Sequence, residues 1–280
     1  MSYQDKYAPY LLVPILRKKE REKIGLSDDK VIFSGKDIWH CYDLSFLDKN
    51  GKPYSGILYL EYDSDSVYLI ESKSLKLYLN SFNMTRFEHI DHVKLVIEKD
   101  LQSVLNTQSI KINIVSSDQF NQQFNNNQTF YNLDNLGNIN DFAYQKDKHI
   151  LQRKTAQQSA KSQIFYSHLL KTNCPMTGQP DFASIYIYYK PYKYAILEDS
   201  LLYYIVSFRE KQEFHELCCE EIITDLAEIL QPQELVVCCK YNRRGGIDIT
   251  PVRIYPKNKA TSIIKNDWIS YLICTREFRQ

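Results

Sequence analysis

The sequence has no apolar run that approaches the roughly 18 residues of a membrane-spanning helix. Its N-terminal apolar segment, residues 10–16, is short and broken by Pro14, and no basic stretch opens the chain ahead of it. We therefore expect neither a membrane helix nor a signal peptide. Lysine and arginine together number 35 and aspartate and glutamate 34, so the net charge is only +1. This balance gives no support for non-specific nucleic-acid binding, which depends on excess positive charge, although it is compatible with a local basic patch.

Several motifs of nucleotide and metal chemistry are also missing. No G-x-G-x-x-G follows a strand and no Walker-type loop occurs, so a bound nucleotide is not held in the Rossmann manner. The six histidines form no H-x-x-x-H pattern and the seven cysteines form no C-x-x-C. The pairs 218–219 and 238–239 are therefore interpreted as small core residues, with zinc ligation as the weaker alternative. An odd number of cysteines without a signal peptide predicts reduced thiols and a cytoplasmic location.

The length of 280 residues, with 44% hydrophobic and 25% charged residues, is typical of about two globular domains. Two segments 126 residues apart follow one plan: an apolar helix (87–104 and 214–229), a turn, and a short strand (109–115 and 234–241). Further strands are expected at 56–63, 66–71 and 183–190. The fold class predicted is α+β, with two tandem modules, each an antiparallel sheet with helices on one face. We place the modules at 1–116 and 161–280.

Between the modules, residues 117–160 form a connection rich in asparagine and glutamine. It lacks an apolar period, so it is expected to be long and partly extended. Its phenylalanines and tyrosines are expected to hold parts of it in place. An inert linker is the favoured interpretation.

Residues 70–78 run from a predicted strand into a predicted helix. Ser72 is expected to cap that helix, which would leave backbone N–H groups, Lys73 and Lys76 facing an anion. The alternative is an ordinary capped helix with solvated lysines.

Residues 173–181 contain two prolines and a glycine, which predict a loop. A cysteine in a polar loop differs from one in a core, since its reactivity depends on thiolate formation. Asp181 lies beyond the turn, where it could exchange a proton with whatever the Cys174 thiol attacks. A turn with an incidental cysteine is the alternative.

Two further segments carry charged groups beside helix or turn backbone. Glu216 stands at the start of the second repeat's helix, where a carboxylate stays charged easily and can accept hydrogen bonds from a heterocycle. Residues 242–246, with two arginines and two glycines, suit phosphate binding. A solvated glutamate beside a packed His215 and a basic turn are the alternatives.

These segments together resemble the NADPH-dependent 7-cyano-7-deazaguanine reductases of queuosine biosynthesis, in their longer two-module form. The matching segments are 71–83, 173–181, 207–216 and 241–249, which follow the family's order across most of the chain. Phe182 departs from the tryptophan expected after the aspartate but keeps an aromatic ring. The resemblance implies the tunnelling fold, in which antiparallel sheets form a barrel and bind purine-like rings where units meet.

The resemblance implies the reduction of a nitrile to a primary amine, with NADPH as cofactor and no metal. Cys174 would add to the nitrile carbon to form a thioimide, and Asp181 would protonate the nitrogen. The substrate 7-cyano-7-deazaguanine would be bound by Ile70, Glu71, Ser72, His215 and Glu216. NADPH would be held by Ser72, Lys73, Arg244 and Gly245.

The family's motifs fall in both modules, so a complete site would need both, within one chain or across a homodimer. No nucleic-acid or membrane partner is implied. Two alternatives remain open at this point: a zinc-dependent cyclohydrolase of the same fold, and a purine-binding protein without activity.

Overall fold

The computed structural model describes residues 4–51, 53–115, 130–136, 142–156, 161–265, 269 and 272. The chain divides into two compact units. Unit 1 consists of Met1–Asp28, Lys36–Gln123 and Arg243–Ile249, and unit 2 of Asp29–Gly35, Phe124–Asn242 and Thr250–Gln280. Within the described ranges, no helix is both long enough and apolar enough to cross a membrane.

Unit 1 is built on a sheet with the strand order β5-β3-β2, in which neighbouring strands are antiparallel. A small antiparallel pair, β1 and β4, lies outside that sheet. The elements are β1 (Pro14–Leu16), α1 (Arg17–Lys23), β2 (Ser34–Leu47, in unit 1 from Lys36), β3 (Pro53–Asp63), β4 (Tyr68–Ile70), α2 (Ser72–Asn80), α3 (Ile90–Leu105) and β5 (Ile110–Val115).

Unit 2 repeats this design with the strand order β12-β11-β9-β8-β6 and a separate pair of β7 and β10. All neighbours are antiparallel except β6, which runs parallel to β8. The elements are β6 (Phe130–Asn132), β7 (Arg153–Thr155), β8 (Gln163–Asn173), β9 (Pro180–Lys190), β10 (Tyr194–Ile196), α4 (Glu198–Ser207), α5 (His215–Leu230), β11 (Glu234–Tyr241), β12 (Ile247–Tyr255, in unit 2 from Thr250) and α6 (Ala260–Ile263).

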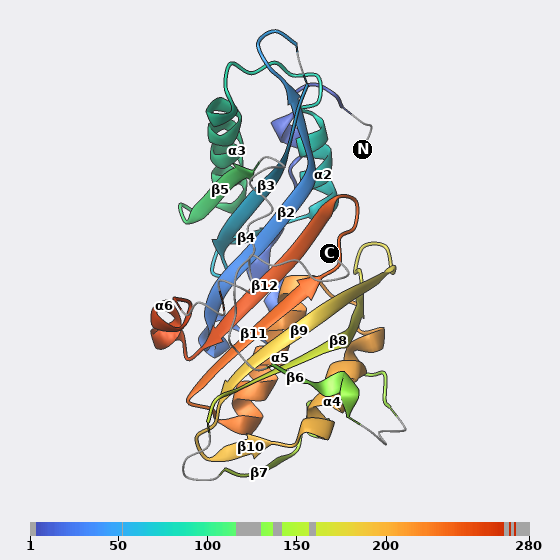
Figure 1. Cartoon of the computed structure of the whole chain (residues 1–280), viewed down its shortest axis with the longest axis vertical. Helices are drawn as coiled ribbons and strands as arrows, with labels where there is room; N and C mark the ends of the chain where they lie inside the picture. Colours follow the sequence, from blue (N-terminus) through green and yellow to red (C-terminus); the bar gives the residue numbers. More distant parts are fainter. Residues whose placement is uncertain are drawn as a thin grey trace. The chain divides into compact units, whose positions relative to one another are not determined.

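Helices pack against the sheet in each unit, α3 against β5 in unit 1 and α5 against β11 in unit 2. In unit 1, alternate residues of β3, such as Leu58 and Leu60, are fully buried in one apolar cluster with Val93 and Ile97 of α3. The intervening residue Tyr59 is only half-buried. This alternation is the signature of a sheet covered by helices on one side. The prediction of α+β modules with antiparallel sheets is therefore confirmed (Figure 1).

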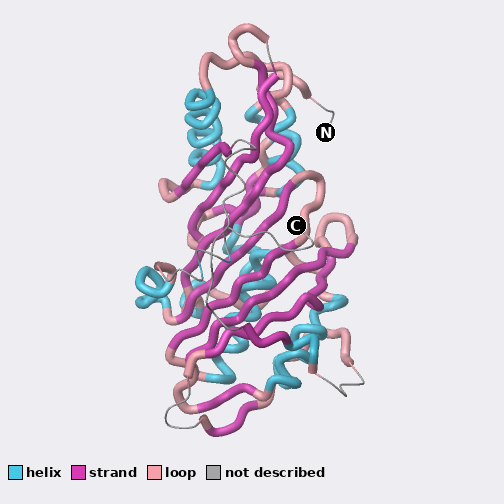
Figure 2. Tube along the Cα trace, in the orientation of Figure 1, coloured by secondary structure: helices cyan, strands magenta, loops and turns pink. Residues whose placement is uncertain are grey.

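The two units share the order of their elements, which can be followed along the chain in Figure 2. The run β2-β3-β4-α2-α3-β5 of unit 1 corresponds to β8-β9-β10-α4-α5-β11 of unit 2. Helices α3 and α5 have 16 residues each, and both end at a residue in the left-handed conformation, Asn106 and Gln231. The repeat predicted from the sequence is thus a structural duplication.

The duplication extends to individual hydrogen bonds. The Tyr78 hydroxyl donates to Asp100 at 2.6 Å, and the Tyr204 hydroxyl donates to Asp225 at 2.7 Å. In each case a buried tyrosine of the shorter helix is tied to a carboxylate of the longer one. Burial and the neighbouring carboxylate raise the pKa of both phenols, so both act as neutral donors.

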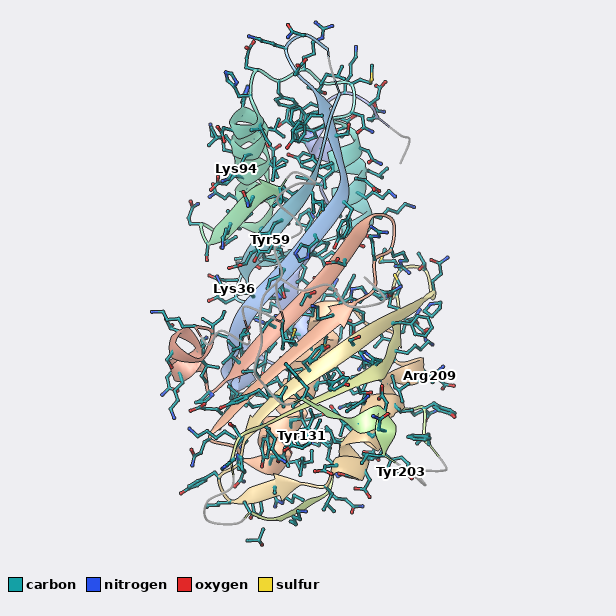
Figure 3. The ribbon with its side chains drawn as sticks, viewed as in Figure 1. Lys36, Tyr59, Lys94, Tyr131, Tyr203 and Arg209 are labelled. Carbon is teal, nitrogen blue, oxygen red and sulfur yellow. The ribbon has the colours of Figure 1, made fainter. Side chains whose placement is uncertain are left out.

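Aromatic side chains attach parts of the 117–160 connection to unit 2. The Phe130 ring on β6 meets Tyr186 of β9 edge-on with centroids 5.9 Å apart. Tyr131 lies 5.9 Å from Phe165, and Phe142 lies 4.9 Å from the Tyr203 ring of α4; Figure 3 labels Tyr131 and Tyr203. The predicted anchoring by aromatic residues is confirmed.

An ion-pair cluster reinforces this attachment. The Lys146 ammonium lies 2.9 Å from Glu221 and 2.7 Å from Asp225, both on α5. Only 17% of the lysine side chain is exposed. The described part of the connection is therefore packed against the unit, and its interpretation as an inert linker stays a prediction. In this asparagine-rich segment, a few well-spaced residues make the anchoring contacts.

Replacing Lys146 by methionine should lower the free energy of unfolding by about 1–2 kcal/mol, because two partly buried carboxylates lose their shared cation. Urea unfolding measures the loss. The matched control is Lys148→Met, which breaks only an exposed pair with Glu228 and should cost less than about 0.5 kcal/mol. Equal losses in the two variants would contradict the packed arrangement.

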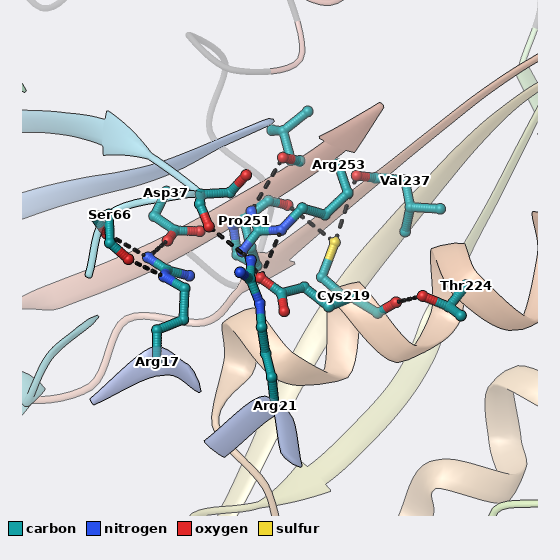
Figure 4. A network of polar contacts seen from close by, with 12 residues as sticks. Arg17, Arg21, Asp37, Ser66, Cys219, Thr224, Val237, Pro251 and Arg253 are labelled. Carbon is teal, nitrogen blue, oxygen red and sulfur yellow. Dashed lines mark hydrogen bonds and ion pairs between the residues drawn. The ribbon is translucent and has the colours of Figure 1, made fainter. Parts of the chain in front are cut away.

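The cysteines of the two adjacent pairs, 218–219 and 238–239, lie in the core of unit 2. Cys218, Cys219, Cys238 and Cys239 are all at most 2% exposed. The Cys219 thiol on α5 is in contact with the carbonyl oxygens of Val237 and Pro251, as Figure 4 shows. Their interpretation as core residues is confirmed. Across the described ranges, no group of three or more His, Cys, Asp or Glu side chains is arranged to hold a metal ion.

Each unit also contains a fully buried ion pair (Figure 4). In unit 1 the Arg17 guanidinium lies 2.7 Å from Asp37, and in unit 2 the Arg253 guanidinium lies 3.0 Å from Glu220. All four side chains are at most 1% exposed. Charges this deep are retained only when they are paired and hydrogen-bonded, so these four residues serve the fold.

Candidate active site

Cys174 begins the loop that joins β8 to β9. Its backbone N–H donates to the Gln179 carbonyl at 2.8 Å, and its carbonyl accepts from the Gly178 N–H at 2.8 Å. Gly178 has a φ of +69°, a left-handed conformation that favours glycine. The loop is therefore closed by hydrogen bonds of its own backbone. The cysteine is 9% exposed, at the border between core and surface.

The segment that leads into α5 lies directly beside this loop. The Asn173 N–H donates to the Lys211 carbonyl at 2.8 Å, and the Asn173 carbonyl accepts from the Glu213 N–H at 3.1 Å. The Gln212 side chain donates to the Cys174 carbonyl at 3.4 Å. These bonds bring the start of α5 to the same end of the β8–β9 hairpin as Cys174.

Asp181 and His215 form a hydrogen-bonded pair at this end of the hairpin. Asp181, paired with Thr172 across the ladder, is 3% exposed. The His215 Nε2 atom, from the first residue of α5, lies 3.1 Å from an Asp181 carboxylate oxygen. The His215 ring stacks on Tyr241 of β11, with centroids 3.7 Å apart and planes 10° apart. Asp181 is thus buried and is oriented by the His215 ring, which Tyr241 holds in place by stacking.

Tyr241 is the functional neighbour that sequence reasoning missed. It opens the segment 241–249, but nothing in its local pattern indicates that it will support a histidine 26 residues earlier. Burial raises the pKa of its phenol well above the ordinary value, so the ring stays neutral beneath His215.

Glu216 occupies the predicted place at the start of α5. It is the second residue of the helix and is 3% exposed. The partial positive charge of a helix N-terminus stabilises a carboxylate there. A buried acceptor therefore stands one residue from His215, on the same turn of helix.

The second set of predicted residues lies in unit 1, where β4 leads into α2. Ile70 is the last residue of β4 and is buried. The expectation that Ser72 caps α2 is wrong: the Glu71 carboxylate accepts from the backbone N–H groups of Lys73 at 3.0 Å and Ser74 at 2.7 Å. Glu71 keeps an extended backbone, whereas Ser72 already belongs to the helix, so only the glutamate can reach back to these donors.

The Arg244-Gly245 turn, which joins β11 to β12, lies beside the same helix. Gly245 and Gly246 have φ values of +61° and +80°. A Cβ atom at Gly245 would lie 3.3 Å from the Lys76 ammonium nitrogen of α2. Because glycine has no side chain, a space remains beside Gly245. This cradle is bordered by Lys76 and is close to the arginines of the turn. Such a cradle fits the phosphate groups of a nucleotide cofactor.

The structure thus gathers the predicted residues into two sets, one in each unit. The set in unit 2 contains Cys174, Asp181, His215 and Glu216. The set in unit 1 contains Ile70, Glu71, Ser72, Lys73, Arg244 and Gly245.

The duplication does not extend to the predicted cysteine, which occurs in one unit. Leu47 is bridged to Arg86 in unit 1 as Asn173 is bridged to Gln212 in unit 2, which makes Asp48 the counterpart of Cys174. The hairpin of unit 1 therefore carries a carboxylate where the hairpin of unit 2 carries a thiol. A carboxylate is a much weaker nucleophile toward a nitrile carbon than a thiolate is.

Comparison with known proteins decides the family. A model described as "Nitrile reductase, 7-cyano-7-deazaguanine-reductase N-term" matches residues 3–114, and a model described as "QueF-like protein" matches residues 180–260. A relative from Azoarcus sp. (strain BH72), named NADPH-dependent 7-cyano-7-deazaguanine reductase, is 40% identical over 90% of this chain and 88% of its own. The chain belongs to the NADPH-dependent 7-cyano-7-deazaguanine reductase family.

Two further relatives carry the same name. The protein of Saccharophagus degradans is 39% identical, covering 90% of this chain and 91% of its own. That of Desulfotalea psychrophila is also 39% identical and covers 90% of each chain. A solved structure of an archaeosine synthase QueF-Like, in the apo form, has a TM-score of 0.33 at 15% identity over 35% of this chain and 95% of its own. The reductase relatives extend across both units, as the predicted motifs do.

Proposed function

We propose that this chain reduces the nitrile of 7-cyano-7-deazaguanine to the primary amine with NADPH, through a covalent thioimide on Cys174. The product would be 7-aminomethyl-7-deazaguanine, a precursor in queuosine biosynthesis. The observation that carries the proposal is the placement of Cys174 and the buried Asp181–His215 pair at one end of the β8–β9 hairpin. The reaction is inferred from the family to which the chain belongs. The residues at this end of the hairpin have the chemical groups that the reaction needs.

The first step is addition of the Cys174 sulfur to the nitrile carbon. One C–S bond forms as the S–H proton leaves the sulfur, and one π bond of the nitrile breaks onto nitrogen, so the proton lost by the thiol balances the one that nitrogen gains. A loop closed by backbone hydrogen bonds fixes the position of the sulfur before the substrate arrives. Covalent addition turns an unreactive nitrile into a thioimide, which accepts hydride more readily.

Asp181 delivers the proton that this addition requires at the nitrogen. Its carboxyl group is buried, which excludes water as a competing partner, and it is oriented by the His215 ring. The stacked Tyr241 keeps that ring from rotating away. We assign Asp181 as the general acid and His215 as a residue of the substrate site that also orients it.

Glu71 and Glu216 are suited to bind the deazaguanine edge, because each presents a carboxylate to donors of the ring. Glu71 uses its oxygens on two backbone N–H groups of α2, and an ionised carboxylate has further lone pairs for a ligand. Ile70 and Ser72 flank it. These residues lie in unit 1 and Glu216 lies in unit 2, and we propose that substrate binding uses both sets.

The residues that would hold NADPH are Ser72, Lys73, Arg244 and Gly245. The glycine cradle beside Lys76 supports this assignment, and cationic side chains suit the extra 2′-phosphate. NADPH, when bound, supplies two hydrides, one to the thioimide carbon and one to the imine that remains after the thiol leaves. Two hydrides and two protons balance the conversion of a nitrile to an amine.

The decisive assay measures NADPH oxidation by the full chain with 7-cyano-7-deazaguanine. We expect two NADPH consumed for each amine formed, because the reduction takes four electrons. A ratio of one would contradict the complete reduction, and no oxidation would favour a purine-binding protein without activity. Stoichiometric zinc without NADPH use would favour a cyclohydrolase, an alternative that the family assignment does not support.

We also propose a homodimer in the cytoplasm. The two-module form of the family suggests the dimer, and the six described cysteines, all free thiols, are compatible with a reducing compartment. Light scattering of the purified chain measures the mass directly. A mass of one chain at micromolar concentration would contradict the dimer.

A further inference from the structure

A buried carboxylate lies beside the turn that carries Arg244 and Gly245. Asp248, the second residue of β12, has a side chain that is 1% exposed. Its Oδ1 atom lies 2.9 Å from His40 Nδ1, and its Oδ2 atom accepts from the Tyr42 hydroxyl at 2.6 Å. Both partners belong to β2. One carboxylate thus ties the chain just beyond the turn to this strand through both of its oxygens.

The same strand also holds the backbone of the turn. The Tyr42 N–H donates to the Gly246 carbonyl at 2.8 Å. A Cβ atom at Gly246 would lie 2.0 Å from an Asp43 carboxylate oxygen, so another residue would displace the Asp43 side chain, and the φ of +80° favours glycine. The turn is therefore in contact with β2 at Gly246 and with α2 at Gly245, where it meets Lys76.

The Tyr42 ring also contacts Arg243, a cationic residue of the turn. The Arg243 guanidinium lies over the Tyr42 ring, 4.8 Å from its centroid. An aromatic face attracts a cation and restricts where it can move. Through its ring, its hydroxyl and its backbone N–H, Tyr42 contacts Arg243, Asp248 and Gly246, three residues in and around the turn.

We propose that Tyr42 and Asp248 are positioning residues for NADPH, with His40 as the second support of the Asp248 carboxylate. The proposal rests on the assignment of Arg244 and Gly245 to the cofactor. Two consecutive glycines have wide backbone freedom, and ordering them only on binding would weaken affinity. The Tyr42–Asp248 bond sets the turn in its binding conformation in advance. Both residues of this bond belong to unit 1, whereas Cys174 and Asp181 belong to unit 2, so we expect the bond to act on cofactor binding.

The test variant is Tyr42→Phe, which removes the hydroxyl but keeps the ring beneath Arg243 and the N–H bond to Gly246. We expect the KM for NADPH to rise about fivefold or more, with kcat and the KM for 7-cyano-7-deazaguanine within about twofold of native values. Asp248→Asn should raise the same KM. The double variant should be about as weak as the worse of the two single variants and clearly better than their sum, because both changes break the same hydrogen bond.

The matched control is Tyr59→Phe. Tyr59, labelled in Figure 3, lies on the neighbouring strand β3, and its ring meets His40 edge-on with centroids 5.4 Å apart. Its hydroxyl donates to Glu61, a residue of the same strand. This variant should leave the KM for NADPH unchanged. An equal rise in the KM for NADPH in Tyr59→Phe would mean that the effect comes from general packing. That result would overturn the proposal.

Arg244→Ala separates failure of this inference from failure of the proposed cofactor site. If Arg244→Ala raises the KM for NADPH while Tyr42→Phe and Asp248→Asn do not, the positioning role is refuted and the cofactor site stands. If Arg244→Ala leaves this KM unchanged, the cofactor assignment fails and the positioning role fails with it. A fall in kcat without a change in KM, in either Tyr42→Phe or Asp248→Asn, would also refute a role confined to cofactor binding.

Discussion

Replacing Cys174 by alanine should reduce kcat to below about one thousandth of the native value, while 7-cyano-7-deazaguanine still binds. The chemical reason is that no other group on the β8–β9 hairpin can form the bond that activates the nitrile. The structural reason for retained binding is that backbone hydrogen bonds of Cys174, which alanine can also make, close the loop. NADPH oxidation measures the first effect, and calorimetric titration with the nitrile measures the second.

The control for this substitution is Cys238→Ala. Cys238 is another free thiol of unit 2, but it is 2% exposed in the core of β11. Its replacement should lower stability by about 1 kcal/mol and leave kcat near its native value. Turnover by Cys174→Ala within tenfold of the native enzyme would refute the nucleophile.

Replacing Asp181 by asparagine should slow reduction by about 10²–10⁴-fold, the range typical of a lost general acid. Asparagine keeps the shape and a hydrogen-bonding oxygen near His215, so the ring should remain in place. What is lost is the proton that the nitrile nitrogen takes up as the sulfur adds. Single-turnover measurement of thioimide formation isolates this step from hydride transfer.

Asp199→Asn provides the matched control, since it makes the same carboxyl-to-amide change at an exposed position in the first turn of α4. It should turn over at the native rate. A near-native rate for Asp181→Asn would instead assign the proton to another donor. Partial recovery in Asp181→Glu would support the acid role over a purely structural one.

The duplicated architecture could be predicted from the sequence because each copy carries its own local pattern. Helix periodicity, alternating strands and a shared 126-residue spacing are visible without knowledge of any contact. The site motifs were predictable for the same reason: Cys174 is marked by its prolines and glycine, and Glu216 by its place at a helix start. Local signals therefore predicted the elements, whereas the roles of these residues came from the resemblance of the combined segments to the reductase family.

Contacts between distant residues could not be predicted. Asp248 and His40 are 208 positions apart, and no local pattern of either one indicates the other. The stacking of His215 on Tyr241 is equally invisible before the strands are placed. The error at Ser72 has a different cause, since serine and glutamate are both competent acceptors and the choice depends on whether the strand ends one residue earlier or later.

The connection between the modules shows how composition can mislead. Its asparagine and glutamine content predicts an extended linker, and the sequence gives no partner for Phe142 or Lys146. Their partners, Tyr203 of α4 and the carboxylates of α5, come from elements that follow much later in the chain. A few anchoring residues in a polar segment are sufficient to hold it.

The most direct test of the account is intact-mass and peptide-mass analysis of the native chain incubated with 7-cyano-7-deazaguanine and no NADPH. We predict a gain of one substrate mass, located on the peptide that contains Cys174. Burial raises the pKa of the Cys41, Cys218 and Cys239 thiols, so they are protonated at neutral pH and should not compete. No added mass in an active preparation, or an added mass that persists in Cys174→Ala, would contradict the covalent mechanism.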